Sequence, residues 1–258
     1  MKLKGKTAAI TGGTAGIGRG IAEAFLAEGA NVALMARNSE KGAKVVAEMG
    51  VGERALFIAG DVMEQDQVEG FIDQTVQHFG AIDILVNNAG GAGDLAPLVD
   101  LTDEAFDMAM KWNIYSSFWA TRRALKPMIA QQWGRVINIS STEGKMGKPT
   151  FAPYTIAKHG INGMTKAVAQ EVGTSGVTVN AICPGLIMTD LILQSGPATA
   201  AGMGMTLDEM IDMISQESAL KRPGKVEEVA AMAVLLASEA GAGITGATLS
   251  VDGGTAQY

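Results

Sequence analysis

The sequence has very few residues of the kinds that hold small secreted proteins or zinc sites together. Its 258 residues include one cysteine, Cys183, and two histidines, His78 and His159. A single cysteine cannot form an internal disulfide, and this set leaves little material for a zinc site. A chain of this length buries roughly three quarters of the surface that it exposes when unfolded, so its core needs no such support. We expect a reducing, cytoplasmic location and no metal site.

Basic charge and long apolar runs are also scarce. Twenty Lys and Arg residues against 27 Asp and Glu residues give a net charge of −7, which disfavours nucleic acid and anionic membranes as partners. The longest apolar run, Val229–Ala237, has nine residues, whereas about 20 are needed to span a bilayer. The first residues carry no apolar stretch of the length found in signal peptides. The sequence therefore predicts an acidic, cytoplasmic globular protein.

What the sequence does contain is a regular alternation of short apolar runs with longer segments of helical spacing. This alternation is typical of βαβ units, in which helices cover both faces of a parallel sheet. We predict one α/β domain over residues 1–258, a Rossmann-type, doubly wound parallel sheet of about seven strands. The predicted strands are 7–11, 31–35, 55–59, 82–86, 134–140, 177–182 and 248–251, and the predicted helices are 17–29, 39–49, 64–79, 102–131, 153–173 and 225–238.

The segment 188–219 interrupts this alternation, because it contains no predicted strand. It lies on the carboxyl-end side of the sheet, where ligands bind in such folds. Methionines adapt their shape to varied apolar groups, and glycines give the backbone freedom. We predict that 188–219 is a mobile lid over an apolar substrate; alternatively it packs passively against the domain. The residues that suggest a lid are Met188, Gly202, Met203, Gly204, Met205, Met210 and Met213.

A glycine-rich turn, Thr11–Gly18, follows the first predicted strand and opens a helix. Gly12 is expected to permit the tight turn, Gly16 to let the backbone approach a pyrophosphate, and Gly18 to allow close packing. The helix N-terminus offers free N–H groups to phosphates. An ordinary turn is the alternative, since the spacing G-x-x-x-G-x-G departs from G-x-G-x-x-G. The predicted cofactor contacts of this turn are Gly12, Thr14, Gly16, Ile17 and Gly18.

Five further features follow this turn in order: NNAG at 87–90, Asn113 in the long central helix, Ser141 after the fifth strand, Tyr154-x-x-x-Lys158, and CPG at 183–185. Together they resemble the motifs of the short-chain dehydrogenase/reductase family, and the resemblance covers essentially the whole chain. Within that family, STEGK at 141–145, APY at 152–154 and KHG at 158–160 are most similar to polyketide and fatty-acid 3-ketoacyl reductases. The resemblance implies the strand order 3-2-1-4-5-6-7 and a homotetramer or dimer.

Tyr154 and Lys158 are four residues apart in a helical stretch, so their side chains share one face. A lysine ammonium and an oxidised nicotinamide cation are expected to lower the pKa of Tyr154 by about three units. Tyr154 would then donate a proton to the substrate oxygen in reduction and remove it in oxidation. The resemblance implies that Ser141 binds this oxygen, that Lys158 also binds the nicotinamide ribose, and that Asn113 bends its helix and holds a water in a proton relay.

The resemblance also assigns the rest of the cofactor site. Asp61 and Val62 would lie near the adenine, although Asp61 could equally be a solvated acid at a strand end. Thr189 would hydrogen-bond the nicotinamide carboxamide. The remaining predicted cofactor contacts are Asn87, Ala89 and Gly90 on the ribose side, Tyr154 and Lys158, and Pro184, Gly185 and Ile187 after the sixth strand.

The end of the second strand, MARNS at 35–39, indicates which cofactor is used. Enzymes that use NAD commonly place an acidic residue here to bind the ribose 2′-hydroxyl. No carboxylate is present, and Arg37 offers a planar fork of donors to a 2′-phosphate. We therefore predict that NADP(H) is preferred and that NAD(H) is possible. The alternative is that Arg37 stacks on the adenine and tolerates either cofactor.

The predicted function is NAD(P)H-dependent reduction of a ketone, 3-ketoacyl-like, cyclic or aliphatic, to a secondary alcohol, or the reverse oxidation. One alternative is a dinucleotide-binding regulator that has lost the chemistry. Another is a serine hydrolase, but no G-x-S-x-G elbow is present and neither histidine has a triad context. The substrate is predicted only as a small-molecule carbonyl or alcohol, because variable loops build the pocket.

Overall fold

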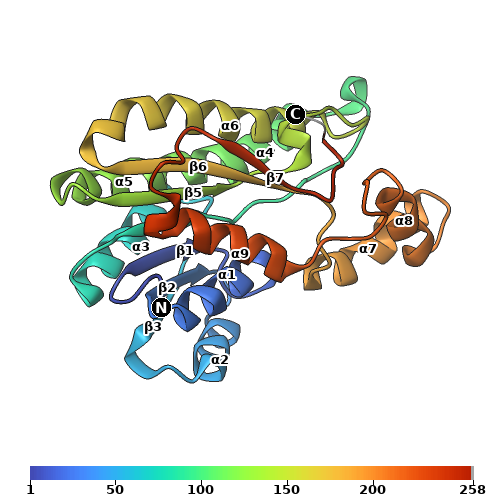
Figure 1. Cartoon of the computed structure of the whole chain (residues 1–258). Helices are drawn as coiled ribbons and strands as arrows, with labels where there is room; N and C mark the ends of the chain where they lie inside the picture. The colour runs from blue at the N-terminus through green and yellow to red at the C-terminus, as the bar shows by residue number, and fades with distance from the viewer. Residues whose placement is uncertain (257–258) are drawn as a thin grey trace.

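A computed structural model of the chain describes residues 1–256, with every side chain among them except those at positions 191 and 195. The predicted domain, 1–258, therefore ends outside the described residues. The model has a seven-stranded parallel sheet in the predicted order, β3-β2-β1-β4-β5-β6-β7 (Figure 1). The strands are β1 (Thr7–Thr11), β2 (Asn31–Ala36), β3 (Ala55–Ala59), β4 (Ile84–Asn87), β5 (Gly134–Ile139), β6 (Val177–Pro184) and β7 (Thr248–Val251).

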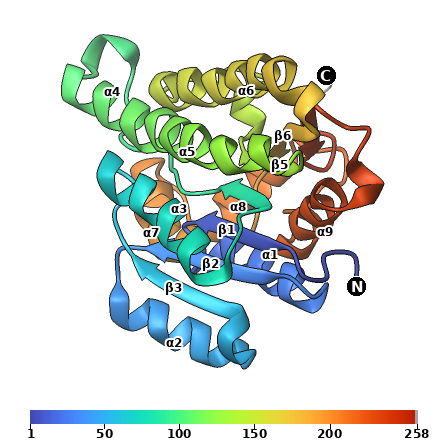
Figure 2. The same cartoon turned by 90° about the vertical axis from the view of Figure 1, so that its left-hand side faces the viewer.

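Helices cover both faces of the sheet, as predicted (Figure 2). Apolar side chains of α1, α2 and α9 form the core on one face, and those of α3, α5 and α6 form the core on the other. The central strands β1, β4 and β5 are buried along their whole length, as expected of strands in a parallel sheet that helices cover on both faces. The helices named here are α1 (Gly16–Ala27), α2 (Ser39–Met49), α3 (Gln65–Phe79), α5 (Ser116–Ala130), α6 (Ala152–Val172) and α9 (Val226–Ala237).

The long predicted helix 102–131 consists of three parts. It contains α4 (Asp103–Met110), a π-helical turn (Lys111–Tyr115) and α5. Asn113 lies in the π turn, which inserts one extra residue per turn and so shifts the faces of α4 and α5 relative to each other. Apolar spacing alone cannot reveal such a turn, because the pattern on either side remains helical.

The segment 188–219 contains no strand, as predicted, but it contains two helices that the sequence analysis did not assign. They are α7 (Asp190–Gly202) and α8 (Leu207–Ser215), and they pack against each other beyond the carboxyl ends of the strands (Figure 1). A single β-bridge, Ile187 to Gly224, joins the two ends of this segment. None of the helices that the structure describes combines the length and hydropathy needed to cross a bilayer.

Candidate active site

The glycine-rich turn joins β1 to α1 in an unusual backbone conformation. Gly12 has φ of 65° and Gly16 has φ of 50°, a region that other residues rarely adopt. The Gly12 N–H donates to the Met35 carbonyl over 2.9 Å. A Cβ added at Gly18 would lie 2.4 Å from the Gly12 carbonyl oxygen. A side chain at Gly18 would therefore force the start of α1 away from the turn.

The residues of this turn fit the pyrophosphate of a dinucleotide. Ala15 stands at the N-cap of α1 and provides no side-chain hydrogen bond, and the first turn contains no acidic residue. The first N–H groups of α1 and the positive end of its dipole are therefore left for an anion. Thr14 is buried beside them, and Ile17 packs against the core, so only backbone and small side chains line the turn.

Asn88, which the sequence analysis did not single out, anchors the turn from the end of β4. Its Nδ2 donates to the carbonyl oxygens of Thr11 and Gly12, over 3.0 and 3.1 Å. The N–H groups of Asn88 and Ala89 in turn donate to Thr11 Oγ1, over 3.0 and 3.1 Å. The second position of NNAG is the signal that could have identified this residue.

The side chain of the neighbouring Asn87 bonds other residues of the fold, so its predicted contact with the cofactor stays a prediction and would have to come from its backbone. Asn87 Nδ2 donates to Thr121 Oγ1 over 2.9 Å and to Asn138 Oδ1 over 2.8 Å, so this side chain is buried between β4, α5 and β5. Successive side chains of a strand point to opposite faces, and here Asn88 therefore takes the position near the turn.

Asn113, Gly90 and Lys158 lie in contact with one another. Asn113 is buried; its Nδ2 donates to the carbonyls of Gly91 and Ala109, each over 3.0 Å. A Cβ added at Gly90 would lie 2.4 Å from Asn113 Oδ1 and 3.5 Å from Lys158 Nζ. The absence of a side chain at Gly90 is what lets these two polar side chains approach each other.

The side chains of Ser141, Tyr154 and Lys158 converge at the carboxyl end of β5. The side chain of Ser141 lies beside the Tyr154 hydroxyl and acts to lower the pKa of that phenol. Lys158 Nζ donates to the Ile139 carbonyl over 2.9 Å and lies 5.4 Å from the centroid of the Tyr154 ring. Tyr154 and Lys158 share one face of α6, as their spacing predicts, and the carbonyl of β5 fixes the ammonium beneath the ring.

Burial dominates the ionisation of this pair. It raises the pKa of Tyr154 to about 12; the neighbouring Ser141 side chain opposes this rise, and the Glu143 carboxylate adds to it. Burial also lowers the pKa of Lys158 to about 8. The predicted fall in the Tyr154 pKa involves an oxidised nicotinamide cation as well as Lys158. It therefore stays a prediction for the cofactor-bound protein.

The other predicted cofactor residues take up varied positions around this centre. Thr189 lies against the turn, since a Cβ added at Gly16 would be 3.2 Å from its Cγ2. The Asp61 carboxylate accepts the Met63 N–H over 2.9 Å, and Val62 is buried beside it. Arg37 is exposed just past β2. Three further residues lie at the end of β6 and just beyond it, beside β7 or at the β-bridge: Pro184, Gly185 and Ile187.

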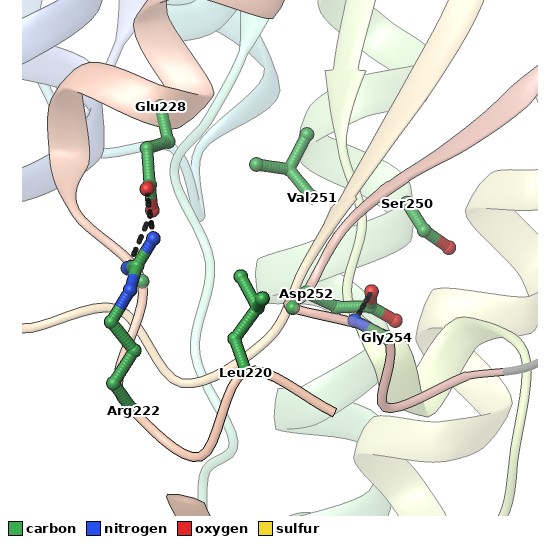
Figure 3. A pocket seen from close by; sticks show the side chains of 9 residues that line it. Leu220, Arg222, Glu228, Ser250, Val251, Asp252 and Gly254 are labelled. Carbon is green, nitrogen blue, oxygen red and sulfur yellow. Dashed lines mark hydrogen bonds and ion pairs between the residues drawn. The ribbon is translucent and has the colours of Figure 1, made fainter. Parts of the chain in front are cut away.

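A separate surface pocket of about 330 Å³ lies next to the ends of β6 and β7 and contains none of the predicted site residues (Figure 3). Across it, the Arg222 guanidinium bonds both carboxylate oxygens of Glu228, over 2.6 and 3.2 Å, and lowers the Glu228 pKa to about 2. The charges of Arg222 and Glu228 are thus paired with each other, and the Asp252 carboxylate, also at the wall, accepts the N–H groups of Gly254 and Ala256. This pocket is not where Ser141 and Tyr154 meet.

Comparisons with known proteins show which family the chain resembles along almost its whole length. A family model described as enoyl-(acyl carrier protein) reductase matches residues 12–256. The chain is 37% identical over 254 residues to D-beta-hydroxybutyrate dehydrogenase of Cupriavidus necator, covering 98% of each protein. It is 36% identical over 256 residues to a 3-oxoacyl-(acyl-carrier-protein) reductase of Chlamydia muridarum, again covering 98% of each. A crystal structure of an actinorhodin polyketide ketoreductase variant with NADPH is similar at a TM-score of 0.92 and 33% identity, over 98% of each chain.

Proposed function

The chain belongs to the short-chain dehydrogenase/reductase family, an oxidoreductase family that acts on hydroxyl and ketone groups. From that premise we propose that it interconverts a ketone and a secondary alcohol, with Tyr154 as the general acid and base. The observation that carries the proposal is the convergence of Ser141, Tyr154 and Lys158 at the end of β5. Burying a lysine ammonium beside a tyrosine costs free energy of folding, and a catalytic role would account for that cost.

Each residue has a distinct part in this chemistry. Tyr154, a neutral phenol in its buried position, donates its proton to the substrate oxygen during reduction. Ser141 orients the Tyr154 hydroxyl and the substrate oxygen. The Lys158 ammonium stabilises the negative charge left on the phenolic oxygen and binds the cofactor ribose. Asn113, fixed in the π turn beside Gly90 and Lys158, holds the lysine end of a proton relay to solvent.

A nicotinamide dinucleotide, when bound, supplies or accepts the hydride. The uncapped N-terminus of α1 and the glycine turn would hold its pyrophosphate. Asp61 and Val62 would lie at the adenine, Ala89 and Gly90 at the ribose, and Thr189 at the carboxamide. Residues at the end of β6 and just beyond it would complete the nicotinamide side, namely Pro184, Gly185 and Ile187.

We propose NADP(H) as the preferred cofactor, with NAD(H) as a slower substitute. Arg37 is exposed at the end of β2, next to the N-terminus of α2, and the adjacent Asn38 caps that helix by accepting the Lys41 N–H over 2.8 Å. A guanidinium and a helix N-terminus are both suited to a 2′-phosphate. The relative with NADPH in its structure supports this choice.

The substrate class follows from the surroundings of the site. We propose that 188–219 acts as a lid, and that the substrate is a small carbonyl compound with an apolar portion, as 3-ketoacyl, cyclic and aliphatic ketones are. We further propose a cytoplasmic enzyme that works as a homotetramer or dimer. The single cysteine, Cys183, is buried and free, which is compatible with a reducing compartment.

The test separates an enzyme from a regulator that only binds a dinucleotide. The purified chain is mixed with NADPH or NADH and a panel of 3-ketoacyl thioesters, cyclic ketones and aliphatic ketones, and absorbance of the reduced nicotinamide is followed. Loss of absorbance with at least one ketone supports the enzyme. Tight cofactor binding by calorimetry without turnover of any member of the panel would favour the regulator.

A further inference from the structure

A carboxylate lies directly against Ser141. Glu143 belongs to the 3-10 helical turn Thr142–Gly144 after β5, and Ser141 caps that turn. Glu143 Oε2 accepts hydrogen bonds from the hydroxyl groups of Ser141 and of Thr142, the latter over 3.0 Å. The Glu143 N–H donates back to Ser141 Oγ over 3.3 Å. The half-buried side chain is therefore folded over the serine and does not extend into solvent.

The second carboxylate oxygen, Oε1, keeps its capacity to accept hydrogen bonds. Both hydroxyl donors bond Oε2, and within residues 1–256 no side chain forms an ion pair with Glu143. The nearby Lys145 donates to Ser250 on β7 over 2.9 Å. A carboxylate offers about four acceptor positions, so several remain beside the reacting hydroxyl groups.

The charge of Glu143 also reaches the reacting groups. Its carboxylate adds to the rise in the pKa of Tyr154 and acts to raise the pKa of Lys158 against the effect of burial. These interactions place Glu143 in the same weakly solvated site as the tyrosine. A charge carried by a substrate next to its carbonyl group would experience the same negative field.

We propose that Glu143 is a specificity-determining residue: its carboxylate accepts a hydrogen bond from a hydroxyl or ammonium group on the carbon next to the reacting carbonyl, and it disfavours a carboxylate there. This inference rests on the proposed function, because it names the substrate class of the same site. Charge-assisted hydrogen bonds correspond to about ten- to a hundredfold in binding, and the preference should fall in that range.

The test uses ketones of one skeleton, CH₃–CO–CH₂–X, that differ only in X. Hydroxyacetone carries a donor, 2-butanone a methyl group and acetoacetate a carboxylate. For each, kcat/KM with NADPH is measured, or the inhibition constant against the best ketone of the panel where turnover is too slow. For wild type we expect kcat/KM for hydroxyacetone to exceed that for acetoacetate by about tenfold or more. Glu143→Gln keeps the shape of the side chain and removes its charge, so the ratio of the two kcat/KM values should fall about tenfold.

Glu171→Gln is the matched control, since it removes one exposed carboxylate from α6; its ratio should equal that of wild type. Glu143→Ala should show the same fall in the preference for hydroxyacetone over acetoacetate as Glu143→Gln. Its melting temperature and its NADPH binding are measured to check that it folds. An unchanged ratio in both Glu143 variants would overturn the inference, and so would an equal slowing of all three ketones, which would indicate that Glu143 only positions Ser141. Failure of wild type to turn over any panel ketone would instead overturn the proposed function, and this inference with it.

Discussion

At the scale of single residues, the proposed chemistry depends on a balance between burial and charge at Tyr154. Burial keeps the phenol protonated, the state that the proposed proton transfer to a ketone oxygen requires. The same burial lowers the pKa of Lys158, whose ammonium we propose to stabilise the phenolate. Burial therefore favours the acid form of Tyr154 and disfavours its phenolate form unless a further cation is bound.

Replacing Tyr154 by phenylalanine should abolish turnover while leaving cofactor binding nearly intact. Phenylalanine keeps the ring and its contact with Phe151 and loses only the transferable proton. We expect kcat to fall by about 10²–10⁴-fold, the usual contribution of general acid catalysis. Steady-state kinetics and NADPH titration of both proteins test this. A variant that retained more than about a tenth of wild-type kcat would contradict the assignment.

The pKa of Lys158, lowered to about 8, should appear in the pH profile. A lysine whose pKa is lowered loses its proton earlier as pH rises, so the ammonium is present below about pH 8 and lost above it. We expect kcat/KM for reduction to be level at lower pH and to decline above this value. A profile that stayed level to pH 10 would show that the ammonium is not required.

Arg37 should set the choice of cofactor. One charge-assisted hydrogen bond contributes about 1.5–3 kcal/mol, so kcat/KM should favour NADPH over NADH by about ten- to a hundredfold. Arg37→Asp should reverse the preference, because a carboxylate repels the 2′-phosphate and binds the 2′-hydroxyl. Both cofactors are compared at one pH and one salt concentration. Equal values for wild type, or no shift toward NADH in the variant, would leave Arg37 without this role.

At the scale of elements, the sheet and most helices follow from sequence patterns, whereas the π turn and the helices of 188–219 do not. Parallel strands buried on both faces, such as β1, leave a clear apolar signal. The π turn at Lys111–Tyr115 leaves no such signal in the sequence, because one inserted residue does not interrupt the helical spacing of 3.6 residues on either side of it. Helix α7 contains Pro197 in its interior, and an internal proline argues against a helix when the sequence alone is considered.

Among the site residues, spacing predicted the Tyr154 and Lys158 pair, since the helical period fixes which side chains share a face. It could not predict Asn88 or Glu143. Asn88 matters through hydrogen bonds to backbone carbonyls of a distant turn, and Glu143 through the way a short turn folds it back onto Ser141. Both effects depend on three-dimensional contacts that cannot be predicted from the residues adjacent in the sequence.

The segment 188–219 should close when ligands bind. α7 and α8 pack on each other; Met210 is buried, whereas Met203 and Met213 are exposed. The segment meets the loop after Ser141 through an ion pair between Lys148 and Glu217, 3.4 Å apart. We expect limited proteolysis to cut within 188–219, and cofactor plus ketone to slow the cutting. Equal cutting rates with and without ligands would show that the segment is passive packing.

At the scale of the whole molecule, the chain leaves large apolar side chains on the outer surface of α4 and α5. Tyr115 and Phe118 are 52% and 41% exposed, and Met108 and Ile129 are also exposed on these helices. The guanidinium of Arg122 lies 4.9 Å from the Phe118 ring. Tyr115 and Phe118 are three residues apart and so lie on one helical face, and exposed apolar side chains that gather on one face favour association.

We therefore expect purified protein to sediment as a dimer or tetramer, with this surface as one of its interfaces. Phe118→Glu removes an apolar ring and places a carboxylate where an apolar contact would be. Burying that charge in an interface is costly even with Arg122 nearby, so this variant should shift toward smaller species. Leu193→Glu is the matched control, because Leu193 is an exposed leucine on α7, away from α4 and α5. Sedimentation velocity over a range of concentrations measures both variants. A wild-type monomer, or the same assembly in Phe118→Glu as in wild type, would exclude this surface as an interface, whereas a shift in Phe118→Glu alone would assign it.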